Sequence, residues 1–461
     1  MDRKTRKSRL PLRPFRSLHV VVTALAIALA VFASPASGQD NIFTGTNTGA
    51  SSIRIAVPDF KPLAADQQTA AFRTIFDTTL YADLANAGVF DIVSKSLLPP
   101  GTPGAPSEMQ LQTYSNAPAS AAFVAFGSFG VVGGRLVANG FLDDAKNLQY
   151  PQVLAKQYSE EPTEDSARQI AHRFADEIIL RLGGGTAGIA ETKIYYVKLS
   201  GGNKEIWAMD YDGANQHQIT HLGTISISPR VAPDNSRLAF SSLGRNGFQI
   251  RMYSLILGRV INFPEVGGTN VSPAWSPDGR EIAYSSSRSG DPEIWISDAG
   301  GSLSRRITNF RGPDVSPAYN PKTGSQITWI SGRTGLPQLY IMNTDGSGVQ
   351  QMTDGGYATS PSWSPNGQVI AFAWDRKYGP GAPGGQDIYV MEVATKKWIQ
   401  LTHDGGRCDF PSWSPDGRHI VYANSADGRA EHMRIWTMLA DGTQRRPLTG
   451  PGADMPNWSW K

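Results

Sequence analysis

An eight-residue pattern that returns about every 44 residues constrains this chain more than any other feature of its sequence. Its fullest form is Ser-Pro-Ala-Trp-Ser-Pro-Asp-Gly at 272–279. The first proline of each copy stands at 229, 273, 317, 361, 411 and 456, so the spacings are 44, 44, 44, 50 and 45 residues. Self-similarity at a fixed period is typical of repeat architectures, in which each unit packs on its neighbours.

Each repeat has the same internal order of turns and strands. In Ser-Pro-Asp-Gly at 276–279 the proline presets φ for a type I turn, and the glycine suits its exit. Alternating apolar runs then predict a second, third and fourth strand, and four antiparallel strands in one repeat make a propeller blade. The second strands are expected at 237–241, 281–285, 326–330, 369–373 and 419–423.

The two ends of the repeat region each lack part of a blade. Residues 192–223 predict three strands without an inner one, whereas 455–460 predict an inner strand without a blade. Joining the two segments completes a sixth blade and ties the ends of the ring together. The sequence therefore predicts a six-bladed β-propeller over 186–461, closed by its C-terminal strand.

Residues 39–185 have a different composition and predict a flexible leader followed by a small α/β domain. Strands are expected at 53–60, 122–129 and 134–141. Asp66 is placed to cap one helix, and Thr163 to cap another whose first turn is acidic. The expected fold class is therefore mixed, with a small N-terminal α/β domain before the propeller.

The first 38 residues read as a cleaved signal peptide. Seven basic residues within 1–16 precede an apolar run from 20 to 33 and small residues at 34–38. Without this segment Lys+Arg falls from 43 to 36 and Asp+Glu from 40 to 39, so the net charge becomes −3. That balance argues against a nucleic-acid partner, and the single Cys408 cannot form an internal disulfide.

Motifs that carry catalysis or bind cofactors are sparse. The sequence holds no Gly-x-Ser-x-Gly, His-Glu-x-x-His or Walker segment. Gly-x-Gly-x-x-Gly at 183–188 lies between a predicted helix and a strand, the reverse of the order that phosphate binding needs. Asp210-x-Asp212-Gly213 favours a hairpin turn over a calcium loop, and His217 and His221 belong to a strand and its exit. We expect no catalytic residue, no metal and no cofactor.

The repeated Pro-x-Trp-Ser-Pro-Asp-Gly blades, closed by Pro-Asn-Trp-Ser at 456–459, resemble the propeller of the TolB family. The order of signal peptide, small α/β domain and six blades is also similar. The resemblance implies a non-enzymatic, monomeric adaptor of the Tol-Pal system in the periplasm, without a membrane span, which supports outer-membrane integrity and cell division. It implies the peptidoglycan-associated lipoprotein Pal as a partner, and TolA as a partner of the N-terminal segment.

The partner site is expected at the mouth of the propeller funnel, just before each repeat proline, where the resemblance implies that Pal is received. We expect three carboxylates there to face the opening, so that Asp314→Arg with Asp409→Arg removes binding and leaves the fold intact. Two alternatives stay open, an exported propeller enzyme of the lyase or peptidase-associated kind and a carbohydrate- or peptide-binding propeller. The expected mouth residues are Thr269, Asn270, Val271, Ser272, Asp314, Val315, Ser316, Thr359, Ser360, Asp409, Phe410, Asp454 and Met455.

Overall fold

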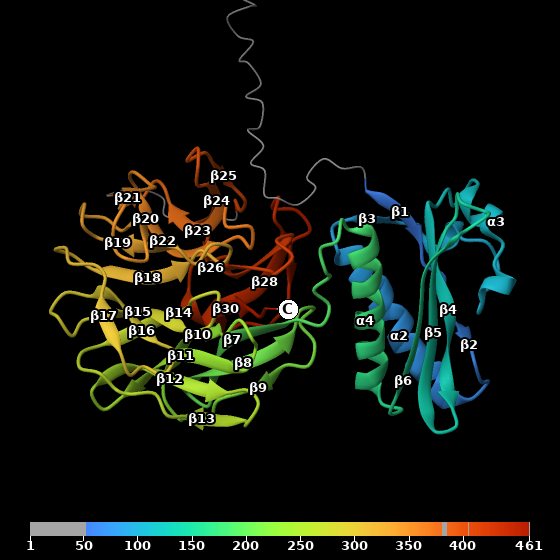
Figure 1. The fold of residues 1–461 in the computed structure, drawn as a ribbon, viewed down its shortest axis with the longest axis horizontal. Helices are drawn as coiled ribbons and strands as arrows, with labels where there is room; N and C mark the ends of the chain where they lie inside the picture. Colours follow the sequence, from blue (N-terminus) through green and yellow to red (C-terminus); the bar gives the residue numbers. More distant parts are fainter. Residues whose placement is uncertain (1–51, 380–384, 404, 461) are drawn as a thin grey trace, which may run out of the picture. The chain divides into compact units, whose positions relative to one another are not determined.

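A computed structural model describes residues 52–379, 385–403 and 405–460 of the chain. The described residues belong to one compact unit, in which an α/β region precedes a six-bladed propeller (Figure 1). The predicted signal peptide and most of the leader lie outside the described residues, as do residues 380–384 within the Gly- and Pro-rich stretch 376–387 that lengthens the 50-residue repeat. Among the described residues, no helix combines the length and apolar character that crossing a membrane requires.

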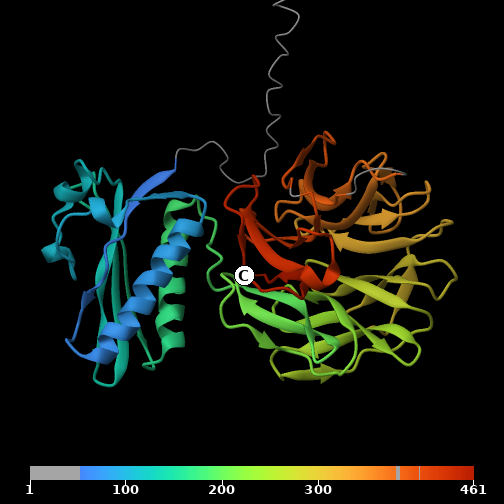
Figure 2. The same cartoon turned by 180° about the vertical axis from the view of Figure 1, so that it is seen from behind.

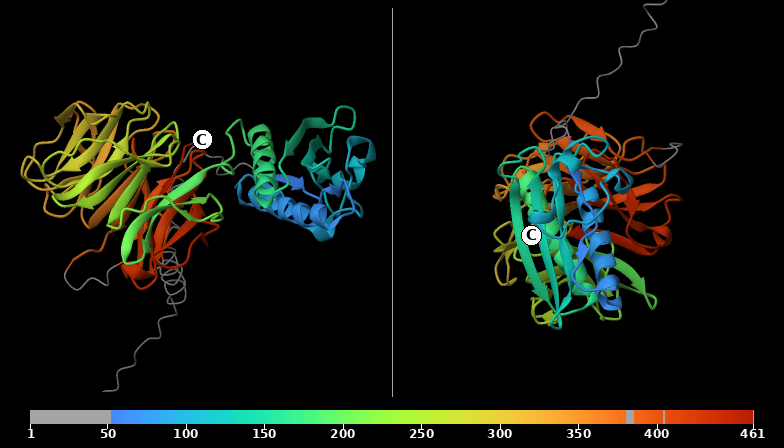
Figure 3. Two further views of the ribbon diagram at one scale, coloured as in Figure 1. Left: turned by 90° about the horizontal axis from the view of Figure 1, so that it is seen from below. Right: turned by 90° about the vertical axis from the view of Figure 1, so that its right-hand side faces the viewer.

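The α/β region is one mixed sheet with two long helices against it. The sheet has the order β3-β1-β4-β5-β6, with β2 paired to β4. Helices α2 and α4 pack on each other and on the sheet through one apolar core, to which Phe60, Phe76, Phe129 and Phe174 contribute (Figure 3, left). The elements are β1 Ile53–Ala56, β2 Lys61–Pro62, α2 Gln67–Asn86, β3 Phe90–Ile92, α3 Leu111–Ser115, β4 Phe123–Val132, β5 Arg135–Asp144, β6 Gln152–Glu160 and α4 Glu164–Leu182, with short 3-10 helices at 95–97 and 106–108.

The helix starts agree with the sequence analysis. The side chain of Asp66 accepts the backbone N–H of Thr69 at 2.8 Å, and Thr163 Oγ1 accepts that of Ser166 at 3.0 Å, so both are N-caps. The strand expected over 53–60 ends at Ala56. Strands β3 and β6 were not expected, because β3 is only three residues long and β6 carries the charged Lys156 and Glu160 on the same face as the buried Leu154, which breaks the alternation of apolar and polar residues.

Six four-stranded sheets make up the propeller, and each second strand predicted from the repeat is present. We number the blades by their inner strands. Blade 1 is β10 Ser226–Val231, β11 Arg237–Gly244, β12 Gly247–Ser254 and β13 Arg259–Ile261; blade 2 is β14 Asn270–Trp275, β15 Glu281–Ser286, β16 Glu293–Asp298 and β17 Ser304–Arg306; blade 3 is β18 Asp314–Tyr319, β19 Gln326–Ser331, β20 Gln338–Asn343 and β21 Gln350–Gln351. Blade 4 is β22 Tyr357–Trp363, β23 Val369–Asp375, β24 Asp387–Glu392 and β25 Trp398–Gln400; blade 5 is β26 Arg407–Trp413, β27 His419–Ser425, β28 Arg434–Leu439 and β29 Arg446–Pro447.

Blade 6 closes the ring with both ends of the repeat region. Its order is β30-β7-β8-β9, where β30 is Ala453–Trp458, β7 Lys193–Ser200, β8 Asn203–Asp210 and β9 His217–Gln218. Strands β30 and β7 are antiparallel, with Asp454 opposite Val197 and Trp458 opposite Ile194. Figure 2 shows the red C-terminal strand beside the green first strands of the propeller. The predicted closure is therefore confirmed.

Every inner strand carries a β-bulge at its repeat proline. The pairing register with the second strand shifts there in all six blades. A proline has no N–H to donate, so within sheets it is confined to edge strands and bulges. The residue before each proline has a left-handed φ of 50° to 56°, which few residues other than glycine adopt.

Hydrogen bonds from buried tryptophans connect several blades to the preceding one. Trp275 Nε1 donates to the carbonyl of Arg230 at 3.0 Å, and Trp363 Nε1 donates to that of Ala318 at 3.1 Å. The indole of Trp458 donates to Thr192 Oγ1 at 2.8 Å, while its backbone N–H reaches Ser412 Oγ at 3.1 Å. The conserved spacing of the aromatic residue in the repeat therefore encodes contacts between blades.

The α/β region contacts the propeller through buried polar groups. The Tyr211 hydroxyl donates to the Asp83 carboxylate of α2, whose other oxygen lies 2.7 Å from His172 Nδ1 of α4. His419 Nε2 of blade 5 lies 2.7 Å from the carbonyl oxygen of Asn86. Because buried polar groups are costly unless they are paired, these contacts favour one docked arrangement.

The closure makes a specific prediction about two tryptophans. Trp458 is 4% exposed in β30 and Trp398 is 37% exposed in β25. We expect Trp458→Ala to lower the free energy of unfolding by about 3–5 kcal/mol, because it leaves a cavity between blades 5 and 6. Trp398→Ala should cost about 1–2 kcal/mol, since less of its surface is removed from water. Chemical denaturation of both variants checks this, and equal losses would contradict a closing role for β30.

Candidate functional site

One end of the propeller channel is a narrow mouth built by the six bulges. A cavity of about 30 Å³ lies there. Each blade contributes its left-handed residue to the wall, and three repeat prolines and Arg230 complete it. The left-handed residues are Ser228, Ser272, Ser316, Ser360, Phe410 and Met455.

The mouth has a polar and an apolar arc. Blades 1 to 4 present serine hydroxyls, whereas the adjacent blades 5 and 6 present Phe410 and Met455. Ser228 Oγ approaches Met455 Sδ at 3.8 Å where the two arcs meet. The Arg407 guanidinium lies 5.9 Å from the centre of the Phe410 ring. The mouth therefore offers hydroxyl donors and acceptors beside two large apolar side chains.

The predicted mouth residues fall into three groups. Five of them line the cavity: Ser272, Ser316, Ser360, Phe410 and Met455. Thr269 is exposed, and Val271, Val315 and Thr359 are half-buried on the inner strands of blades 2, 3 and 4. Asn270 is fully buried, and its amide donates to Gln249 Oε1 at 3.0 Å.

The sequence analysis missed Ser228 and Arg230 of blade 1. Their segment, Ser-Pro-Arg-Val-Ala-Pro-Asp-Asn at 228–235, lacks the tryptophan or tyrosine that the other copies carry. Alignment on the repeat proline, which is visible in the sequence, would have placed both residues.

The three carboxylates do not face the opening as expected. Asp314, Asp409 and Asp454 are all buried. Asp314 accepts from Arg333 Nη2 at 3.1 Å, and Asp409 accepts from Arg407 Nη2 at 2.8 Å. Arginines at positions 314 and 409 would break both ion pairs and bury new cations, so that double substitution cannot leave the fold intact.

Of these three buried carboxylates, Asp454 alone forms no ion pair with any described residue. Its Oδ1 accepts the backbone N–H of Met455 at 2.8 Å. Burial raises the pKa of Asp454, and the neighbouring charge of Asp409 raises it further. The group therefore keeps its proton in the folded chain at pH values where an unfolded chain has lost it.

The other candidate motifs have structural roles. Asp212 pairs with Arg168 at 2.6 Å in the turn after β8, and His217 Nδ1 contacts the carbonyl oxygen of Asn215 at 2.8 Å. The glycine motif at 183–188 connects α4 to β7, as expected. In the described part of the chain, no three His, Cys, Asp or Glu side chains are grouped so as to hold a metal ion.

Comparison with known proteins identifies the family. The model of the TolB beta propeller domain matches residues 181–461, which is the greater part of the chain. The Tol-Pal system protein TolB of Gluconobacter oxydans is 31% identical over 412 residues, covering 78% of this chain and 86% of that protein. The chain belongs to the TolB family.

Other TolB proteins match over shorter lengths. A Protein TolB homolog of Chlorobium luteolum is 29% identical over 290 residues, or 60% of this chain and 62% of that protein. The match to a homologue from Chlorobium chlorochromatii spans 44% of its length. The crystal structure of TolB from Acinetobacter baumannii has a TM-score of 0.74 at 23% identity, over 89% of this chain and 97% of that one, so the two share the TolB fold.

Replacing Asp454 or Asp314 by asparagine should change the stability of the chain in opposite directions at pH 7. Above the ordinary pKa of 3.8, the unfolded chain ionises at position 454 while the folded chain does not, so stability falls with rising pH until the raised pKa is passed. Asp454→Asn removes this loss while keeping an acceptor for the Met455 N–H. We expect its thermal midpoint to exceed that of the unsubstituted chain at pH 7 and to match it at pH 3.

The matched variant is Asp314→Asn, which leaves Arg333 without its carboxylate. We expect it to lose about 1–3 kcal/mol at pH 7. Thermal melts at both pH values measure the two effects. A lower midpoint for Asp454→Asn at pH 7 would mean that Asp454 is ionised and needed in that form.

Proposed function

We propose that this TolB-family chain is a non-enzymatic periplasmic adaptor of the Tol-Pal system that binds Pal at the propeller mouth. In this role it supports outer-membrane integrity and the invagination of the envelope at division. Relatives from Gluconobacter oxydans and Desulfosudis oleivorans are named Tol-Pal system proteins, which supports the proposal that this chain acts in the same system. TolA is the proposed partner of the N-terminal segment, which lies outside the described residues.

The two-arc composition of the mouth is the observation on which the partner site depends. Binding energy at protein interfaces is concentrated in a few large side chains that are surrounded by weaker contacts. Phe410 and Met455 are half-buried and line the cavity side by side with four hydroxyl-bearing blades. A folded partner can therefore bury an apolar group against blades 5 and 6 and form hydrogen bonds with blades 1 to 4.

The mouth is also a rigid platform. Bulges fix each left-handed residue between paired segments of an inner strand. Backbone conformations of this kind persist only where the surrounding structure holds them. A preformed surface loses little conformational entropy on binding, which favours recognition of a folded protein.

The repeat supplies a variant that tests this site without disturbing the fold. Phe410→Ser with Met455→Ser gives blades 5 and 6 the residue that blades 1 to 4 already carry at the same left-handed position. We expect the double variant to bind the periplasmic domain of the same organism's Pal at least about tenfold more weakly, a loss of roughly 1.4 kcal/mol or more. Isothermal titration calorimetry measures the affinity, and a thermal melt checks the fold.

Ile256→Ser with Leu303→Ser is the matched control. Both residues are exposed and lie in turns between third and fourth strands, at the ends of those strands away from the mouth. We expect the control to bind as the unsubstituted chain does. Unchanged affinity in the Phe410 and Met455 variant would move the site elsewhere, and absence of Pal binding by the unsubstituted chain would overturn the adaptor proposal.

A further inference from the structure

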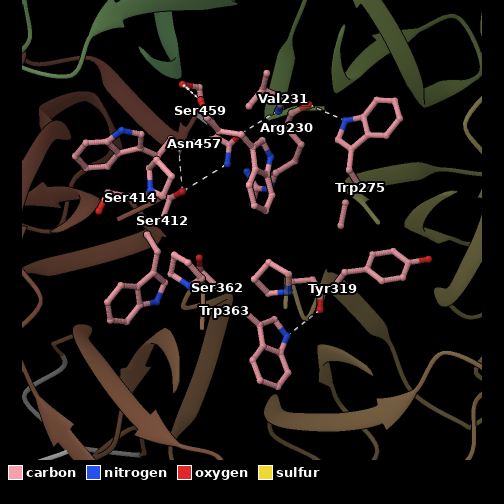
Figure 4. A pocket seen from close by; sticks show the side chains of 18 of the residues that line it. Arg230, Val231, Trp275, Tyr319, Ser362, Trp363, Ser412, Ser414, Asn457 and Ser459 are labelled. Atoms are coloured by element: carbon pink, nitrogen blue, oxygen red, sulfur yellow. Dashed lines mark hydrogen bonds between the residues drawn. The ribbon is translucent and has the colours of Figure 1, made fainter. Parts of the chain in front are cut away.

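A second cavity lies at the opposite end of the channel from the mouth. Its volume is about 120 Å³, and its wall comes from the C-terminal parts of the inner strands and from the Ser-Pro turns that follow them. We call it the tryptophan-lined cavity. Figure 4 shows labelled residues of several blades around this opening. Its aromatic residues are Trp275, Tyr319, Trp363, Trp413, Trp458 and Trp460, and five prolines complete the apolar part of the wall.

Arg230 is the one charged residue among those that line this cavity. It also lines the mouth cavity, so it stands between the two cavities. The bulges align position 230 with five neutral residues of the other blades. These are Ala274, Ala318, Ser362, Ser412 and Asn457.

The guanidinium of Arg230 has few partners within the chain. Nη1 donates to the carbonyl of Pro229 at 2.8 Å, and no carboxylate of the described residues forms an ion pair with it. Burial lowers the pKa of Arg230 to about 10, which still leaves it charged at neutral pH. A charge surrounded by protein is costly unless it is paired, so the remaining N–H groups favour an anionic acceptor.

The neighbouring polar groups are mostly paired within the chain. Asn457 Oδ1 already accepts the backbone N–H of Val231 at 3.0 Å, and Ser412 Oγ accepts that of Trp458 at 3.1 Å. In contrast, the buried Nε1 of Trp413 has no hydrogen-bond partner. Trp275, Trp363 and Trp458 each donate theirs to the chain. The unpaired N–H groups of the Arg230 guanidinium therefore select a ligand with acceptor oxygens.

We propose that the tryptophan-lined cavity binds a small organic carboxylate. The carboxylate accepts hydrogen bonds from the Arg230 guanidinium, and the apolar body of the ligand packs on the surrounding aromatic and proline side chains. The cavity is slightly smaller than the cavity of about 150 Å³ that holds benzene in another protein. The cavity is open on one side, so the part of a benzene-sized ligand that exceeds its volume can extend outward. A neutral ligand of the same shape leaves the guanidinium unpaired and is therefore disfavoured.

Benzoate is a suitable probe, and benzamide is its neutral analogue. We expect the full chain to bind benzoate with a Kd on the order of 1 mM or below, and benzamide at least tenfold more weakly. Calorimetry measures the affinities, and quenching of tryptophan fluorescence reports contact with the cavity wall. Absence of saturable benzoate binding, or equal affinity for benzamide, would overturn the proposal.

Arg230→Ala tests the residue itself and gives blade 1 the side chain that blades 2 and 3 carry at positions 274 and 318. We expect it to melt no lower than the unsubstituted chain and to lose benzoate affinity by at least about tenfold. Arg230→Lys keeps the charge without the planar fork of donors. Its affinity for benzoate should therefore lie between that of the unsubstituted chain and that of Arg230→Ala. Arg259→Ala, at an exposed position of β13, makes the same change in net charge and should bind normally.

The mouth variant separates this inference from the proposed function. Phe410→Ser with Met455→Ser should retain benzoate binding, because neither side chain lines the tryptophan-lined cavity. Unchanged affinity in Arg230→Ala, or loss of benzoate binding in the mouth variant, would place the ligand elsewhere and contradict the assignment.

Discussion

The structure depends on the inability of one blade to bury its own faces. A four-stranded sheet has two apolar surfaces, and in this chain one is covered by the preceding blade and the other by the following blade. Ala283 of the second strand of blade 2 and Ile294 and Ile296 of its third strand share a core with residues of blade 3, namely Tyr319, Trp329 and Tyr340. In such an array each interface between neighbours adds stability, and closing the ring gives the two end blades the neighbour they would otherwise lack. The pairing of β30 with β7 therefore supports every other contact between blades.

The sequence predicted this architecture because the repeat encodes it locally. Prolines, turn glycines and alternating apolar residues recur at nearly constant spacing, and each has a direct structural cause. The conformation of the residue before each proline could not be predicted in the same way. Residues before proline ordinarily favour extended backbone, whereas Ser272, Phe410 and Met455 are left-handed here. The bulge that holds them arises from pairing with the second strand, which is a tertiary effect.

The mouth shows where inference from the repeat stops. Position relative to the proline placed Ser316, Ser360 and Phe410 on the channel, but it could not show which neighbouring side chains turn inward. Asp314 and Asp409 lie one or two residues from the opening and are nevertheless buried, each paired with an arginine. Arg333 is nineteen residues from Asp314, and nothing in the local pattern links the two. The contacts between α2 and the propeller likewise join segments with no shared periodicity.

Departures from the repeat carry information that the repeat itself lacks. Where all six blades agree, as in the bulged proline, the common residue serves the ring. Where one blade differs, the ring does not require the difference, since five other blades form the same contacts without it. Phe410 and Met455 give the mouth an apolar side that four serines cannot supply, and Arg230 places a cation in a channel that is otherwise neutral at that level. A half-buried cation without a carboxylate partner lowers stability unless something binds it, so we expect the ring to fold at least as readily with alanine there, the residue that blades 2 and 3 carry. Both proposed binding sites of this propeller therefore depend on positions at which its blades differ from one another.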